Sequence, residues 1–266
     1  MTVINTNIKS LIAQQALAVN NRGLSKAMEQ LSTGKRINSA GDDAAGTAIA
    51  SKMTSQVRGL NVAIRNANDA ISLAQTMEGA LDEVTNILQR VREIGLQAAN
   101  GTYSANDRGA LQTEYSALQS EISRISSATT WNGSNYLGST TTLSFQIGAD
   151  ANVQAALVIS NIVTGFAGVA SLAAAGAGVS TVALAASAIA HADDAISQVN
   201  TMRSTIGAFI NRLNYAADNL TNIATNTAAS RSRIMDTDYA QATSDLAKRQ
   251  ILQQAATAML AQANQQ

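Results

Sequence analysis

The chain has 266 residues, of which 46% are hydrophobic and 3% are aromatic. Its 18 basic and 18 acidic side chains are mixed along the sequence and cancel, so no charge footprint indicates nucleic acid or an anionic membrane as a partner. The absence of cysteine excludes disulfides and thiolate zinc sites, and the absence of proline allows long helices without a break.

Weakly apolar helical segments are predicted at both ends of the chain. The apolar positions of the first are Ile8, Leu11 or Ile12, Leu24, Met28 and Leu31. Those of the last are Leu246, Ile251, Leu252, Ala255, Met259 and Leu260. Both segments are rich in Gln, Asn and Ala, and such helices are marginal when alone in water. We therefore expect the ends to be poorly ordered in a monomer and to become ordered by assembly.

A long helix is predicted from about residue 50. Apolar residues recur with alternating spacings of three and four at Ala50, Met53, Val57, Leu60, Ile64, Ala67, Ile71 and Ala74. After a phase shift, the pattern resumes at Met77, Leu81, Val84, Leu88 and Val91. This periodicity predicts a nearly continuous helix of about fifty residues, or roughly 75 Å at 1.5 Å per residue.

Two further helical patterns follow. The shorter one runs from Leu111 to Ile125, and the longer one keeps its heptads from Ile189 to Ala224. A helix with such a sustained apolar stripe needs a partner helix. The first long helix, packed antiparallel, is the simplest partner.

The region between these two patterns is predicted to contain strands. The pair Asn132-Gly133 is a turn signal. Alternating apolar residues in LSFQIGADANVQAALVI, at 143–159, predict one β-hairpin with a longer turn. The uncharged segment 166–190 consists mainly of Ala, Gly, Ser and Thr, which favours a loop and the start of an Ala-rich helix over a membrane span.

No group of residues in the sequence has the pattern of an active site. The single histidine, His191, is followed by Asp193 and Asp194, but a metal site or a triad needs further ligands or a nucleophile at matched geometry. The acidic pair Asp42-Asp43 lies between helices, where carboxylates cap a helix N-terminus. We therefore expect no enzyme activity, no catalytic or metal-binding residue and no cofactor.

Six stretches of the sequence resemble bacterial flagellins, the subunits of the flagellar filament. They are VINTNIKSL at the start, LSTGKRINSAGDDAAGTAIA at 31–50, RNANDAISLAQTMEGALDEV at 65–84, LQRVREIGLQAANGT at 88–102, and SRIMDTDYA and QILQQAATAMLAQANQ near the end. The resemblance covers most of residues 1–138 and 189–266. The family pattern continues for a short apolar stretch beyond the AQANQQ at which this sequence stops.

The resemblance implies a structural protein that forms a homopolymeric helical filament for motility. In flagellins, the two chain ends pair as helices that form the inner tube of the filament, and the long central helices form the next layer. Flagellins are exported by the flagellar type III apparatus without a cleaved signal peptide, and none is visible here. The family implies an export chaperone, cap and hook-junction proteins as partners. The assembly residues carried over are Ile4, Ile8, Leu11, Leu31, Leu246, Ile251, Leu252 and Met259.

These elements predict a mainly α fold, namely an elongated antiparallel bundle or coiled coil of long helices with a small β-hairpin region and paired terminal helices. The predicted divisions are paired terminal helices at 1–44 and 235–266, a long-helix rod at 45–138 and 189–234, and a short variable region at 139–188. We expect no insertion into a membrane. The alternatives are a hook-filament junction protein or another secreted helical protein, such as an adhesin or effector.

The stretch LQRVREIGLQAANGT places a polar surface on the first long helix. At about 100° per residue, Leu88 and Val91 point toward the helical partner. Arg90, Ile94 and Gln97 then fall on the opposite side, so Ile94 is predicted to be an outward apolar residue. The resemblance implies that this surface packs against a neighbouring subunit and that the Toll-like flagellin receptor of vertebrates recognises it, with Arg90 as an anchor. The predicted interface consists of Gln89, Arg90, Glu93, Ile94, Gln97 and Glu114.

Overall fold

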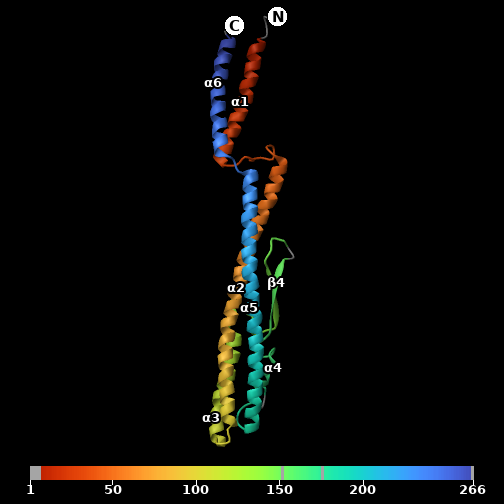
Figure 1. Ribbon diagram of the computed structural model, residues 1–266, viewed down its shortest axis with the longest axis vertical. Helices are drawn as coiled ribbons and strands as arrows, with labels where there is room; N and C mark the ends of the chain where they lie inside the picture. The colour runs from red at the N-terminus through yellow and green to blue at the C-terminus, as the bar shows by residue number, and fades with distance from the viewer. Residues whose placement is uncertain (1–6, 151–152, 175–176, 265–266) are drawn as a thin grey trace. The chain divides into compact units, whose positions relative to one another are not determined.

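The computed structural model of the protein describes residues 7–150, 153–174 and 177–264, which are predominantly helical (Figure 1). In chain order, the elements are α1 (Ile8–Thr33), α2 (Ala44–Ala99), α3 (Ala105–Ala128), β1 (Thr130–Trp131), β2 (Ser134–Asn135), β3 (Thr141–Gln146), β4 (Gln154–Ile159), α4 (Ala167–Leu172), α5 (Val182–Met235) and α6 (Tyr239–Asn264). These elements confirm the predicted mainly α fold with a small β-hairpin region.

The chain forms two compact units. Unit 1 combines Met1–Arg58 with Ala224–Gln266, and unit 2 is Gly59–Ile223. Unit 1 is larger than the predicted terminal domain of 1–44 and 235–266, because it also includes the first turns of α2 and the last turns of α5.

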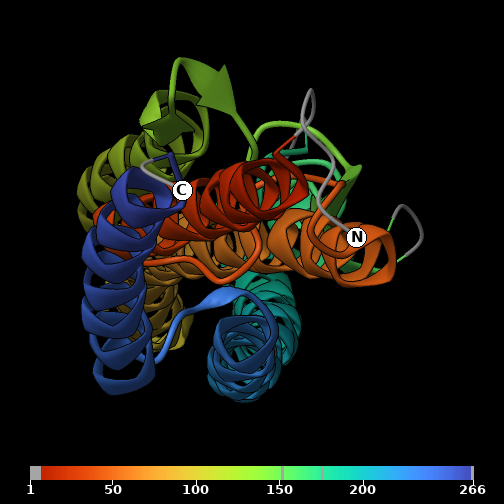
Figure 2. The same ribbon diagram turned by 90° about the horizontal axis from the view of Figure 1, so that it is seen from above.

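In unit 1, α1 and α6 pack side by side in antiparallel directions (Figure 1), and Figure 2 shows them from above. The Asn7 side chain donates a hydrogen bond to the carbonyl of Ala263 at 2.7 Å, and the Asn20 side chain donates to the carbonyl of Arg249 at 2.9 Å. Residue numbers therefore increase along α1 in the direction in which they decrease along α6, so the two helices are antiparallel. The predicted pairing of the terminal helices is confirmed.

The α1–α2 connection and the α5–α6 connection are joined by backbone hydrogen bonds. Arg36 N–H donates to the carbonyl of Met235 at 2.6 Å, and Thr237 N–H donates to the carbonyl of Gly34 at 3.0 Å. Gly34 ends α1 with a φ of 68°, in the left-handed region that favours glycine. These hydrogen bonds hold the α1–α2 connection against the α5–α6 connection.

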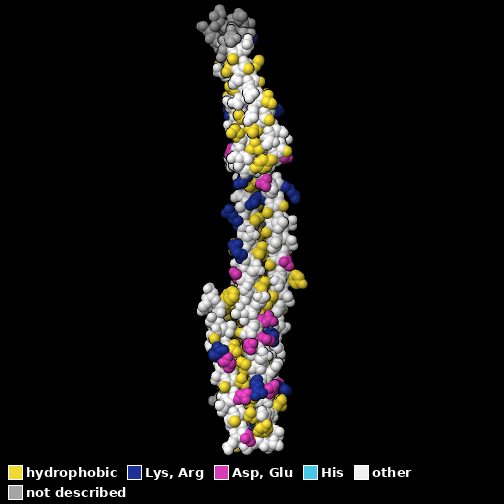
Figure 3. Space-filling model, turned by 90° about the vertical axis from the view of Figure 1, so that its left-hand side faces the viewer, with side chains coloured by type: hydrophobic (Ala, Val, Ile, Leu, Met, Phe, Trp, Pro, Cys, Tyr) yellow, Lys and Arg dark blue, Asp and Glu magenta, His cyan; other side chains and the backbone are white. Residues whose placement is uncertain are grey.

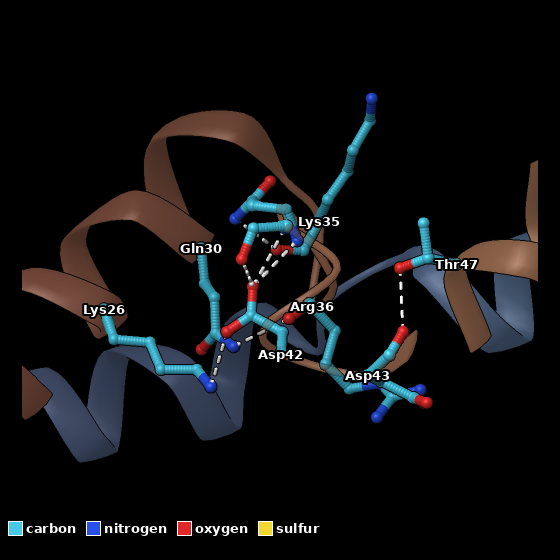
Figure 4. A network of polar contacts seen from close by, with 9 residues as sticks. Lys26, Gln30, Lys35, Arg36, Asp42, Asp43 and Thr47 are labelled. Carbon is cyan, nitrogen blue, oxygen red and sulfur yellow. Dashed lines mark hydrogen bonds and ion pairs between the residues drawn. The ribbon is translucent and has the colours of Figure 1, made fainter. Parts of the chain in front are cut away.

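The two acidic residues before α2 have different roles (Figure 4). Asp43 caps α2, because its side chain accepts a hydrogen bond from Gly46 N–H at 2.8 Å. Capping is therefore confirmed for Asp43 and wrong for Asp42. The Asp42 carboxylate instead accepts hydrogen bonds from the preceding turn and lies 2.7 Å from Lys26 Nζ on α1.

In unit 2, α2 and α5 run antiparallel, as two ion pairs establish. Arg203 Nη2 lies 2.9 Å from Asp82 Oδ1, and Arg92 Nε lies 2.6 Å from Asp193 Oδ1. Numbers rise from 82 to 92 on α2 while they fall from 203 to 193 on α5. The prediction of one continuous long helix is confirmed, because α2 has 56 residues and its phase shift near residue 75 does not interrupt it.

The core of unit 2 is formed by α2, α3 and α5 together with one face of the β3–β4 hairpin. Each of the three helices contributes fully buried side chains. Examples are Leu81 on α2, Tyr115 on α3 and Ile206 on α5. On β4, Leu157 and Ile159 are buried while Val158 between them is exposed, as expected for a strand with one face on a core. The strands pair antiparallel over 141–146 and 154–159, which confirms the predicted hairpin.

A second, very short hairpin pairs β1 with β2. Its two-residue turn is Asn132-Gly133, with φ values of 48° and 78°. A turn of this type needs positive φ at both central residues, which Asn and Gly adopt most readily. The sequence predicts the turn but not the strands, because two residues per strand leave no alternation to detect.

In the uncharged segment 166–190, the start of α5 confirms the predicted helix start, but helix α4 lies where a loop was predicted. Gly168 on α4 lies so close to α5 that a Cβ there would come within 2.7 Å of Ala195 Cα. Within the described ranges, no helix is long and apolar enough to cross a membrane.

Candidate assembly and recognition surfaces

The paired helices α1 and α6 expose many large apolar side chains. The exposed ones, which we call the terminal-helix surface, are Ile8, Leu11, Ile12, Val19, Met28, Ile251, Leu252 and Met259. Ile251 is 66% exposed and Met259 is 67% exposed. Apolar side chains reach the surface of this pair in the space-filling view (Figure 3).

This exposure follows from the packing of two helices against each other without a third. Two helices bury one stripe each, so an apolar residue outside that stripe faces solvent. Within the described part of α1 and α6, the buried residues are Ser10, Ala27 and Ala242, which offer little apolar area. Full burial of a Leu, Ile or Met side chain contributes about 1.5–3 kcal/mol. The terminal-helix surface therefore offers apolar area whose burial would be favourable.

Five of the predicted assembly residues lie on the terminal-helix surface, namely Ile8, Leu11, Ile251, Leu252 and Met259. Leu31 and Leu246 are half-buried, and Ile4 lies outside the described residues. Sequence reasoning missed Val19, which is 52% exposed. Its position seven residues after Ile12 places both on one face of α1, and that spacing was the available signal.

The polar surface on α2 is built around one arginine. Arg90 Nε donates to Glu114 Oε1 on α3 at 2.8 Å, and Arg90 Nη1 donates to Glu93 Oε2 at 3.0 Å. Gln97 donates to the hydroxyl of Tyr103 at 2.8 Å. The recognition surface, as we use the term below, consists of Gln89, Arg90, Glu93, Gln97 and Glu114.

The two carboxylates keep Arg90 charged and oriented. The hydrogen bond that Arg90 donates to Glu114, and then the one that it donates to Glu93, raise the pKa of Arg90 above its ordinary value. The Arg90 side chain is nevertheless 48% exposed, and that of Glu93 is 65% exposed. The structure thus brings together three of the predicted interface residues in an accessible, ordered cluster.

Ile94 is not part of this surface, and the prediction of an outward Ile94 is wrong. Its side chain is 0% exposed and belongs to the core of unit 2. The periodicity argument assigned α2 one partner helix, whereas α3 contributes to the same core and is joined to α2 by the Arg90–Glu114 ion pair. The exposed apolar residue of this stretch is Leu96, at 49%.

His191 is half-buried near the start of α5. Among the residues described, no group of three or more His, Asp and Glu side chains is placed to hold a metal ion. Three ion pairs of unit 2 join helices: one links α2 to α3, and two link α2 to α5.

Comparison with known proteins agrees with the resemblance noted in the sequence. The bacterial flagellin N-terminal helical region matches residues 4–142, and the bacterial flagellin C-terminal helical region matches residues 189–266. Flagellar filament core protein flaB2 of Brachyspira hyodysenteriae is 42% identical over 273 residues, which cover 98% of this chain and 96% of that protein.

Two further relatives support the same assignment. A flagellin of Halalkalibacterium halodurans is 42% identical over 265 residues, which cover 99% of this chain and 96% of that protein. The crystal structure of Bacillus cereus flagellin matches with a TM-score of 0.50 at 33% identity, covering 63% of this chain and 94% of that one. The chain therefore belongs to the bacterial flagellin family, whose members are structural subunits of the flagellar filament and not enzymes.

Proposed function

We propose that this protein is exported by the flagellar type III apparatus and polymerises outside the cell through its terminal-helix surface. The exposed apolar side chains of α1 and α6 carry the proposal, because they lose their contact with water only when other molecules cover them. The lack of cysteine is compatible with export before folding. An enclosed filament core would bury both helices against those of neighbouring copies.

The same surface supports the family's other partners. An export chaperone would cover the apolar side chains of α1 and α6 before assembly, and cap and hook-junction proteins would meet them at the two ends of the filament. We include neither nucleic acid nor an inserted membrane segment among the partners.

Point variants of α6 test the assembly role. Negative-stain electron microscopy after addition of a precipitating salt near neutral pH should reveal long, uniform filaments of the wild-type chain. Ile251→Asp should abolish them, because a charge at this site opposes burial. Gln254→Asp, at an exposed polar position of the same helix, should polymerise normally and serves as the control.

Two results would contradict this role. Normal filaments from Ile251→Asp would exclude the terminal-helix surface from assembly. Persistent monomers of the wild-type chain under these conditions would argue against a main filament subunit and in favour of a hook-filament junction protein.

A second function, as a ligand of the Toll-like flagellin receptor of vertebrates, is favoured by the recognition surface. Arg90 is both accessible and held by Glu114 and Glu93, so its binding to a partner would cost little conformational freedom. Arginines of this kind are frequent among the residues that dominate binding.

Receptor binding can be measured with the isolated receptor ectodomain. Arg90→Ala should weaken the affinity at least about tenfold. Arg124→Ala is the matched control, because Arg124 is also exposed and ion-paired, but on α3 with Glu121. Equal affinities of the two variants would exclude Arg90 as an anchor.

A further inference from the structure

The turn between α2 and α3 contains an Asn-Gly pair that the proposed function does not use. Asn100 follows the last residue of α2, Gly101 comes next, and both are exposed. Glycine has no Cβ to shield its backbone nitrogen, so this nitrogen can attack the side chain of a preceding asparagine. A Cβ at Gly101 would meet no atom within 4 Å, so the space beside this part of the backbone is open.

The hydrogen bonds of the turn orient the Asn100 side chain for such an attack. Asn100 Oδ1 accepts a hydrogen bond from Thr102 N–H at 3.3 Å, which is an Asx turn. The side chain therefore curls over the intervening Gly101 amide, and its carboxamide carbon lies next to the Gly101 nitrogen. Within the described ranges, the Gly101 N–H donates no hydrogen bond, so no acceptor of the protein holds its proton.

We propose that Asn100 is a site of spontaneous deamidation, in which the Gly101 nitrogen is the nucleophile and the Thr102 N–H stabilises the reacting oxygen. Hydroxide removes the Gly101 amide proton, and the nitrogen forms a bond with the carboxamide carbon of Asn100. Negative charge then moves to Oδ1, to which Thr102 N–H already donates. The carboxamide nitrogen takes a proton from water and leaves as ammonia, which regenerates hydroxide and completes a succinimide ring.

Water then opens the succinimide ring at either of its two carbonyl carbons. Opening at one carbon gives aspartate with the normal path of the main chain. Opening at the other gives isoaspartate, in which the main chain passes through the former side chain. The overall reaction consumes one water and releases one ammonia, and position 100 gains a negative charge.

The second Asn-Gly pair of the chain is an internal reference for this reaction. Asn132 and Gly133 form the turn between β1 and β2, and both are exposed and have positive φ. Trp131 pairs with Ser134 on either side of them. In the part of the chain that the structure describes, no N–H donates to the Asn132 side chain. Asn132 therefore lacks the oxyanion donor that Asn100 has, and we expect it to react more slowly.

Isoaspartate at position 100 would affect the recognition surface through Tyr103. The Asn100 carbonyl accepts hydrogen bonds from Tyr103 N–H and from Arg108 Nη1, both at 3.4 Å. In isoaspartate this carbonyl becomes part of a free carboxylate, and the main chain gains a methylene group. Both changes displace Tyr103, whose hydroxyl accepts a hydrogen bond from Gln97 at 2.8 Å. Deamidation thus marks the age of a subunit beside the recognition surface.

Peptide mass spectrometry of the full-length chain, incubated at mildly alkaline pH, provides the test. In the folded chain, Asn100 should deamidate at least about fivefold faster than Asn132, which is the effect of one additional hydrogen bond. In guanidinium chloride the two pairs should react at similar rates, because neither then has a fixed donor. Labelling with an isoaspartyl methyltransferase should locate isoaspartate in the peptide that contains Asn100.

Gly101→Ala is the matched variant. Gly101 is not among the glycines with positive φ, and an added Cβ has open space, so the turn should be kept. Circular dichroism checks that the helical content is unchanged. The added methyl group hinders the backbone nitrogen, so deamidation of Asn100 should become severalfold slower while that of Asn132 stays as in the wild-type chain.

Three outcomes would overturn the proposal. The first is an Asn100 that stays intact in the folded chain, and the second is equal rates for Asn100 and Asn132 in the folded chain. The third is an unchanged rate in Gly101→Ala, which would exclude the Gly101 nitrogen as the nucleophile. The inference goes beyond the proposed function, because this chemistry needs neither filaments nor a receptor, and a failure of either proposed function would leave the mass-spectrometric result unchanged.

Discussion

The guanidinium of Arg90 on α2 meets the carboxylate of Glu114 on α3 at two points, with Nε at 2.8 Å and Nη2 at 2.7 Å from the same oxygen, Oε1. If Glu114 serves to orient Arg90, the two residues act as one unit in binding. We expect Arg90→Ala and Glu114→Ala each to weaken binding of the receptor ectodomain about tenfold, and the double variant to bind little more weakly than Arg90→Ala. Additive losses in this cycle would indicate independent contacts.

Burial of Ile94 gives a prediction about the stability of unit 2. Ile94→Ala should lower the free energy of unfolding by about 2–5 kcal/mol, because it removes a fully buried side chain and leaves a cavity. Leu96→Ala, two residues away and 49% exposed, should change it by no more than about 0.5 kcal/mol. Urea denaturation followed by circular dichroism measures both. Similar effects of the two substitutions would show that Ile94 faces solvent in solution.

The burial of Ile94 and the exposure of Leu96 show which structural features sequence periodicity can predict and which it cannot. The heptads of α2 and α5 predicted two long helices and their antiparallel packing, because each stripe needs a partner of equal length. They did not predict where α3 packs, since a short pattern ending at Ile125 does not identify its contact face. Ile94 was therefore assigned to solvent, although its side chain belongs to the buried core of unit 2, to which α3 also contributes.

The turn between α1 and α2 should respond to acid through Asp42. Lys26, and then the backbone N–H groups of Ser39 and Asn38, hold the pKa of Asp42 well below its usual range. Since the folded pKa lies below the unfolded value of about 3.9, the ionised carboxylate stabilises the fold above that pH. This contribution is lost as the pH falls from about 3.9 toward the folded pKa.

Carboxyl carbon NMR can follow the titration of Asp42 directly. In the Lys26→Met variant, we expect the midpoint to move up toward the ordinary value of about 3.9, because the largest cause of the lowered pKa is removed. Lys9→Met, on the same helix, should leave the midpoint where it is in the wild-type chain. A midpoint unaffected by Lys26→Met would mean that the ion pair does not form in solution.

Two glycines should respond in opposite directions to substitution by alanine. Gly168 approaches the backbone of α5, and a Cβ there would lie 2.7 Å from both Ala195 Cα and the carbonyl oxygen of His191. Gly168→Ala should therefore destabilise the chain by about 1–3 kcal/mol. Gly109 lies in α3 with no atom near its potential Cβ, so Gly109→Ala should stabilise by about 0.5–1 kcal/mol. Equal shifts in thermal unfolding would contradict the close contact of α4 with α5.

The terminal helices and the core of unit 2 should differ in hydrogen exchange in the monomer. Amides of α1 and α6 should exchange fast, because these helices bury few apolar side chains and expose the terminal-helix surface. Amides around Leu81, Leu88 and Ile206, whose side chains are fully buried, should exchange slowly. In assembled filaments, protection should rise mainly in α1 and α6, because neighbouring copies then bury their apolar faces. Mass spectrometry of peptides from both states measures this difference, and equally strong protection of the ends in the monomer would exclude ordering by assembly.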